Sequence, residues 1–152
     1  MPREKTLEEN YDDCISKGYL NETRKVDVAK IKSNIKLSDE LIESARDDSD
    51  KQRRNAGYDS LYDALHNLVE AFLAFDKVRS SNHQCLFAWL CYKHPELELD
   101  WSFFERIRTR RNGINYYGEP ITKEKFNQDK LGFKLYANLL KNKILKRLKS
   151  NE

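Results

Sequence analysis

The sequence is poor in residues that break secondary structure, with only five glycines and three prolines among 152 residues. So few breakers leave little room for the many turns of a β-rich fold. No stretch approaches the roughly 18 apolar residues that a membrane-spanning helix needs. The segment Met1–Lys5 also lacks the apolar run of a signal peptide. These absences lead us to expect a soluble, cytoplasmic protein without a membrane partner.

Cysteine is scarce and odd in number, and none of Cys14, Cys85 and Cys91 has metal-ligand spacing. Cys85 and Cys91 lie in an apolar run, which is typical of buried, reduced thiols. The chain contains no serine-nucleophile motif, no glycine-rich phosphate loop and no paired-carboxylate signature. We therefore expect neither a metal nor a cofactor.

Charged residues are abundant, at 35% of the chain, and they are unevenly distributed. Residues 1–100 contain 15 basic and 20 acidic side chains, whereas residues 101–152 contain 13 and 5. A basic C-terminal third attracts anionic partners such as RNA, a nucleotide or an acidic protein surface. The same charges also suit the solvated ends of helices. The imbalance alone therefore identifies no partner.

Apolar residues recur at helical spacing along most of the chain. The strongest stripe, from Tyr58 to Phe75, predicts the central helix of the core. We expect an all-α fold, an up-and-down bundle of about five or six helices, forming one domain over 1–152 with its core at about 5–148. The expected helices cover about 4–17, 26–50, 58–78, 83–92, 100–117 and 122–148.

Several polar residues indicate where helices begin. Asn21, Asn82 and Asp100 each precede an apolar-periodic segment and are expected to act as N-caps. The alternating residues 96–99 resemble a short strand, but nothing nearby offers them a partner strand. We therefore expect a loop there.

The most distinctive stretch is 105–118, in which four arginines fall within six residues before two tyrosines and a glycine. Helical spacing places Arg111, alone among these arginines, on the apolar face that Phe104, Ile107 and Ile114 form. A guanidinium on such a face must pair with an acid or bind an anion, because an unpaired buried charge is costly.

Two interpretations of Arg111 stay open at this point. In one, planar donors and a phenol from this helix bind a phosphate. In the other, Arg111 forms a structural ion pair with Glu70 or Asp63 on the central helix. The candidate residues for binding RNA or a nucleotide are Arg108, Arg111, Asn112, Asn115, Tyr116 and Tyr117. None of His66, His83 and His94 is predicted to be catalytic.

Four segments, in their order and spacing, resemble the HEPN superfamily of prokaryotic proteins. They are the helical run 39–46, the Tyr/Leu-rich central helix, the turn 81–84 and the motif Arg-Asn-Gly-Ile-Asn-Tyr-Tyr-Gly at 111–118. The resemblance covers about residues 5–148. It implies a helical bundle that forms a homodimer. It also implies a role in toxin–antitoxin or other defence systems, with a nucleotidyltransferase or antitoxin as partner protein.

Catalytic members of that superfamily are metal-independent ribonucleases that use an arginine, a polar residue after it and a histidine at a dimer cleft. The resemblance places Arg111 and Asn112 at the first two positions and Tyr116 at that of the histidine, so Arg111 and Tyr116 are the candidate catalytic pair. A phenol, with a pKa near 10, moves protons less readily at neutral pH than imidazole. The expected function is therefore binding of RNA or a nucleotide at an Arg/Tyr-lined cleft. A ribonuclease toxin and a non-enzymatic partner of a nucleotidyltransferase or antitoxin are the alternatives.

Overall fold

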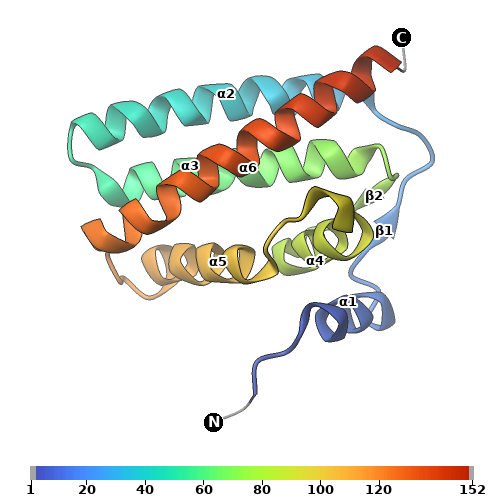
Figure 1. Ribbon diagram of the computed structural model, residues 1–152, viewed down its shortest axis with the longest axis horizontal. Helices are drawn as coiled ribbons and strands as arrows, with labels where there is room; N and C mark the ends of the chain where they lie inside the picture. The colour runs from blue at the N-terminus through green and yellow to red at the C-terminus, as the bar shows by residue number, and fades with distance from the viewer. Residues whose placement is uncertain (1–2, 151–152) are drawn as a thin grey trace.

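The computed structural model describes residues 3–150, and over these residues the chain forms six α-helices (Figure 1). The predicted all-α bundle is therefore confirmed. The segment expected to be a loop contains a single 3-10 turn, η1 (Pro95–Leu97), and no strand. The helices are α1 (Leu7–Ser16), α2 (Val28–Asp50), α3 (Arg54–Ala74), α4 (His83–Lys93), α5 (Trp101–Tyr116) and α6 (Lys123–Ser150).

Helix α3 is the centre of the bundle, as its apolar stripe predicts. It packs against α2, α4, α5 and α6. Figure 1 shows α2 and α3 as an antiparallel pair, with α6 crossing diagonally over α3. Burial of each leucine of α3 stabilises the fold by roughly 1.5–3 kcal/mol. The most deeply buried side chains of α3 are Tyr58, Tyr62, Leu65, Leu68, Val69 and Leu73, each at most 1% exposed.

Side-chain caps fix where the helices begin. Asn82 accepts a hydrogen bond from the backbone N–H of the third residue of α4, and Asp100 accepts one from the second residue of α5, so both predicted caps are confirmed. The prediction for Asn21 is wrong. Asp27 caps α2 instead, because the chain between α1 and α2 first forms a short strand that contains Asn21.

That strand, β1 (Asn21–Glu22), pairs with β2 (Val78–Arg79) in an antiparallel, two-stranded sheet. Strands of two residues are too short to show an alternating pattern, so hydrophobic periodicity does not predict them. The pairing ties the α1–α2 connection to the α3–α4 connection. The hydroxyl of Ser80 strengthens this tie by donating a hydrogen bond to the carbonyl of Tyr19, at 2.6 Å.

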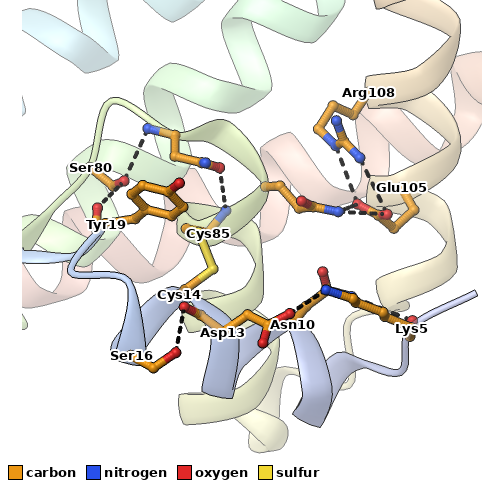
Figure 2. The surroundings of a disulfide bond; sticks show 12 residues. Lys5, Asn10, Asp13, Cys14, Ser16, Tyr19, Ser80, Cys85, Glu105 and Arg108 are labelled. Carbon is orange, nitrogen blue, oxygen red and sulfur yellow. Dashed lines mark hydrogen bonds and ion pairs between the residues drawn. A yellow bond between two sulfur atoms is a disulfide. The ribbon is translucent and has the colours of Figure 1, made fainter.

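The prediction that Cys85 is a reduced thiol is wrong, because it forms a disulfide with Cys14 (Figure 2). The bond joins α1 to α4, which pack against each other although the two cysteines are 71 residues apart in sequence. Periodicity within one helix does not show which helices become neighbours. Cys91 is free and buried, as expected, and burial raises the pKa of its thiol to about 12. Disulfides are rare in the cytosol, so the cysteines no longer support the expected cytoplasmic location.

The side chain of Phe103 on α5 packs directly against Gly132 of α6. A Cβ atom at that position would lie 2.5 Å from Cε2 of Phe103, whose side chain is only 5% exposed. Because the ring is buried, only glycine leaves room for it at this position. None of the helices within residues 3–150 is both long and apolar enough to cross a membrane.

Candidate functional site

The four arginines of α5 divide between two sides of the helix. Arg106 and Arg110 reach α6, where their guanidinium groups contact the carboxylate of Asp129 at 2.8 and 2.7 Å. Tyr58 donates a hydrogen bond to the same carboxylate at 2.7 Å, and Asp129 is completely buried. These two arginines therefore have a structural role. The other two, Arg108 and Arg111, lie toward α3 and α4.

Arg111 is not the only half-buried arginine of α5. The side chain of Arg110 is 17% exposed, whereas that of Arg111 is 22% exposed. Arg110 is buried because α6 covers its side of the helix and supplies Asp129 as a partner. The spacing of residues within α5 contains no information about that partner, so it does not predict that Arg110 is also half-buried.

Arg111 is half-buried, as predicted, but its charge is only loosely paired. Its guanidinium carbon lies 5.1 Å from the ring centre of Tyr62, in a cation–π arrangement. Its nearest acidic atom is Oδ1 of Asp63, at 3.7 Å from Nη2. This distance is too long for a hydrogen bond. The buried Nε atom has no hydrogen-bond partner among residues 3–150. Because Nε is buried, only the outer Nη atoms of Arg111 are placed to meet an anion.

Two histidines lie beside this arginine. The rings of His66 on α3 and His83 on α4 stack with their centres 3.8 Å apart. Nδ1 of His83 is hydrogen-bonded to the hydroxyl of Tyr62, at 2.9 Å. Nε2 of His66 is buried without a hydrogen bond in the described part of the chain, and its nearest acid, Glu70, is 3.7 Å away. The site therefore contains two imidazoles that the sequence did not bring together.

Both imidazoles are held in the neutral state. Burial, followed by the nearby His83 and Arg111, lowers the pKa of His66 to about 3. Burial also lowers the pKa of His83, with further contributions from Arg111 and Arg108. A proton on either ring would face positive charge in a poorly solvated position. Near pH 7 each ring therefore offers both a hydrogen-bond donor and an acceptor.

Arg108 is held by residues of α4 and α5. Its guanidinium contacts the carboxylate of Glu105 on the same helix, at 3.3 and 3.4 Å (Figure 2). Gln84 of α4 donates to both oxygens of that carboxylate, at 3.2 and 3.0 Å. The long distances between Arg108 and Glu105 leave this pair weaker than the pairs at Asp129. We call Tyr62, His66, His83, Arg108 and Arg111 the Arg–His face.

The remaining candidates lie at the end of α5, and they are more exposed. Asn115 donates hydrogen bonds to Asp59 of α3 and to the carbonyl of Arg111. Asn112 is half-buried. Tyr116 and Tyr117 are 69% and 73% exposed, so they are not core-edge aromatics. Of the predicted catalytic pair, Arg111 is therefore a half-buried cation, whereas Tyr116 is an exposed phenol.

Acidic groups surround the Arg–His face and balance part of its charge. Burial raises the pKa of both Asp59 and Asp63, against the lowering effect of the nearby Arg111. The side chain of Asp63 is 44% exposed, so it can turn toward solvent when an anion approaches. Within residues 3–150, no three His, Cys, Asp or Glu side chains are placed to hold a metal ion.

The sequence did not identify Tyr62, His66 and His83 as site residues. Tyr62 and His66 are four residues apart on α3 and therefore share one face of that helix, which is a weak signal. Nothing in the sequence indicates that His83 would stack on them, because this contact depends on the packing of α4 against α3. No protein-family model matches the chain, and a search of curated proteins found no similar sequence. The resemblance to the HEPN superfamily stays a prediction.

Proposed function

We propose that this chain is a HEPN-like protein that binds RNA through the phosphate groups of a single strand at the Arg–His face. The observation that supports this proposal most strongly is Arg111, a half-buried guanidinium whose nearest acid within residues 3–150 lies 3.7 Å from Nη2, too far for a hydrogen bond. A phosphate oxygen accepts hydrogen bonds from guanidinium in a planar, two-pronged geometry. The neutral imidazole of His83 adds an uncharged polar group beside it.

The exposed tyrosines supply the second element of the proposed site. Tyr116 and Tyr117 lie at the end of α5, beyond Arg111, and their rings are largely exposed. Aromatic rings next to a cationic site stack on unpaired bases, at about 1–3 kcal/mol per base. We propose that they bind the bases that follow the phosphate at Arg111. Asn112 and Asn115 then lie between the phosphate and the bases.

We also propose that two copies of the chain form the site. The resemblance to the HEPN superfamily implies a homodimer in which two arginines equivalent to Arg111 meet in one cleft. Light scattering or analytical ultracentrifugation measures the mass directly, and a monomer at micromolar concentration would contradict this part of the proposal.

Measuring the affinity for RNA in two matched variants tests the proposed site. Arg111→Ala should weaken binding of a single-stranded RNA about tenfold or more, the effect of losing one charge-assisted hydrogen-bonding group. Arg46→Ala removes the same charge from an exposed position on α2 and should change affinity little. Equal effects of the two substitutions would show that only net charge matters, and the proposed site would then be wrong.

A second candidate function is cleavage of the bound RNA, and the position of His83 favours it. Its Nδ1 contacts the Tyr62 hydroxyl, which fixes the ring. Its lowered pKa keeps it unprotonated and able to act as a base. If Nδ1 carries the ring proton, Nε2 takes a proton from the ribose 2′-hydroxyl. The 2′-oxygen then bonds to phosphorus, the bond to the 5′-oxygen breaks, and that oxygen takes a proton from water.

Cleavage by this route predicts a specific pattern among variants. His83→Gln should lower the rate of RNA cleavage about 10²–10⁴-fold, the usual contribution of a general base, while RNA affinity stays within a few-fold. Tyr116→Phe should leave the rate unchanged. The cyclic phosphate product is identified by mass spectrometry. A protein that cleaves no RNA, or one whose cleavage needs Tyr116 and not His83, would exclude this candidate.

A further inference from the structure

A separate pocket opens beyond the Arg–His face, where the C-terminal end of α3, the N-terminal end of α2 and the two-stranded sheet meet. Its volume is about 600 Å³. That size falls within the usual range of small-molecule sites, about 300–1,000 Å³. The floor of the pocket is apolar, and the side chains that form it are buried. It is formed by Ile31, Ala71, Val78 and Leu86, each at most 5% exposed.

Four basic side chains line the same pocket: Arg24, Lys25, Lys30 and Arg79. They come from three separate segments, namely the chain before α2, the first turn of α2, and β2. None of the four forms an ion pair with an acidic side chain of residues 3–150, although most other arginines of the chain do. These cations therefore lie around one pocket without a close ion pair to the acidic side chains of residues 3–150.

Two acidic residues also line the pocket, and neither cancels this charge fully. Asp27 is the N-cap of α2 and accepts a hydrogen bond from the backbone N–H of Lys30. Burial raises the pKa of Glu70, despite the opposing charge of Lys30. The positive end of the α2 dipole also faces this region, since the pocket includes the first turn of that 23-residue helix. The electrostatics of the pocket therefore favour an anion.

We propose that this pocket binds a nucleoside phosphate. The apolar floor fits the flat face of a base, and the basic side chains at the rim fit the phosphates. Asn21, Asn34 and Thr23 also line the pocket and offer hydrogen bonds to the edge of a base and to the sugar. The bounded volume suits one nucleotide rather than a continuous RNA strand. This proposal does not depend on RNA binding at the Arg–His face.

Titration calorimetry of the full chain with ATP, UTP, adenosine and inorganic phosphate tests the proposal. At least one triphosphate should bind at one site per chain. Adenosine and inorganic phosphate should each bind at least tenfold more weakly, because each lacks one half of the ligand. The proposal is overturned if neither triphosphate binds, or if inorganic phosphate binds as tightly as a triphosphate.

A matched pair of variants on α2 locates the site. Lys30→Ala removes a cation that lines the pocket and should weaken triphosphate binding severalfold to tenfold. Lys32→Ala removes the same charge two residues later, outside the pocket lining, from an exposed position without an ion pair, and should change the affinity by less than twofold. Equal losses in both variants would overturn the proposal.

A third variant separates this site from the Arg–His face. Arg111→Ala should leave triphosphate binding unchanged, because Arg111 does not line the pocket. Loss of triphosphate binding in this variant would place the nucleotide on the Arg–His face and overturn the proposal. Failure of RNA binding with intact triphosphate binding would instead contradict the proposed function alone.

Discussion

Replacing Asp129 by alanine should cause one of the largest losses of stability that a single substitution produces in this chain. The carboxylate is completely buried, and it binds Arg106, Arg110 and Tyr58 at 2.7–2.8 Å. Breaking a buried, hydrogen-bonded ion pair typically costs about 3–5 kcal/mol. Domains of this size unfold with only about 5–15 kcal/mol. We place the loss near 3 kcal/mol, because Arg106 is 35% exposed and its guanidinium can turn toward solvent.

Urea denaturation of matched variants measures this loss and tests the division of the arginines. Arg110→Ala should lower the free energy of unfolding by about 1.5–3 kcal/mol, because it removes a charged hydrogen-bond donor from the buried carboxylate. Arg108→Ala should lower it by less than about 0.5 kcal/mol, since its partner Glu105 lies on the same helix, three residues away. A loss below 1 kcal/mol for Asp129→Ala, or equal losses for both arginines, would refute this reasoning.

Three further perturbations have defined outcomes. Gly132→Ala should lower the free energy of unfolding by about 1–2 kcal/mol, because overpacking against the buried ring of Phe103 outweighs the better helix propensity of alanine. Gly57→Ala is the control, since its Cβ would make only ordinary van der Waals contacts, and it should not destabilise the fold. Thermal melts of both variants test this difference. Reduction of the bond between Cys14 and Cys85 should cost roughly 4 kcal/mol, from the 71-residue loop that it closes; an unchanged urea midpoint in reductant would contradict this value. His66 has a pKa of about 3 in the folded state, against an ordinary value of 6.5. Its contribution to the free energy of unfolding is therefore present above pH 6.5 and is lost as the pH falls toward 3, by up to about 1.4 kcal/mol per pH unit. His66→Gln should remove this loss between pH 6.5 and 5, and an identical dependence of stability on pH for both proteins would disprove the prediction.

The sequence predicts the features that depend on one helix at a time. The apolar stripe of α3 identifies the central helix, and Asn82 and Asp100 identify two helix starts, because both signals come from residues a few positions apart. Features that depend on how helices pack were not predictable. The disulfide at Cys85 needs α1 to dock on α4, and the stack of His66 on His83 needs α4 to dock on α3.

The candidate site shows the same division. Helical spacing correctly predicts that Arg111 is half-buried, and Asp63 is among the ion-pair partners considered from the sequence. The spacing does not reveal the buried Asp129, so it does not predict that Arg110 is half-buried as well. The motif that resembles the HEPN superfamily predicts Tyr116 as the catalytic partner of Arg111. The structure instead places two histidines next to Arg111, from helices that the motif does not include.

The central claim is that Arg111 contacts a phosphate of bound RNA. The most direct test is the salt dependence of the affinity for a single-stranded RNA, measured for the unmodified chain and for Arg111→Ala. Each phosphate contact contributes about 0.7 to the slope of log K against log salt concentration for single strands. We predict that the variant has a slope smaller by about 0.7, with its free energy of unfolding almost unchanged. An unchanged slope, with affinity lost only through unfolding, would show that Arg111 is a structural residue and would contradict the claim.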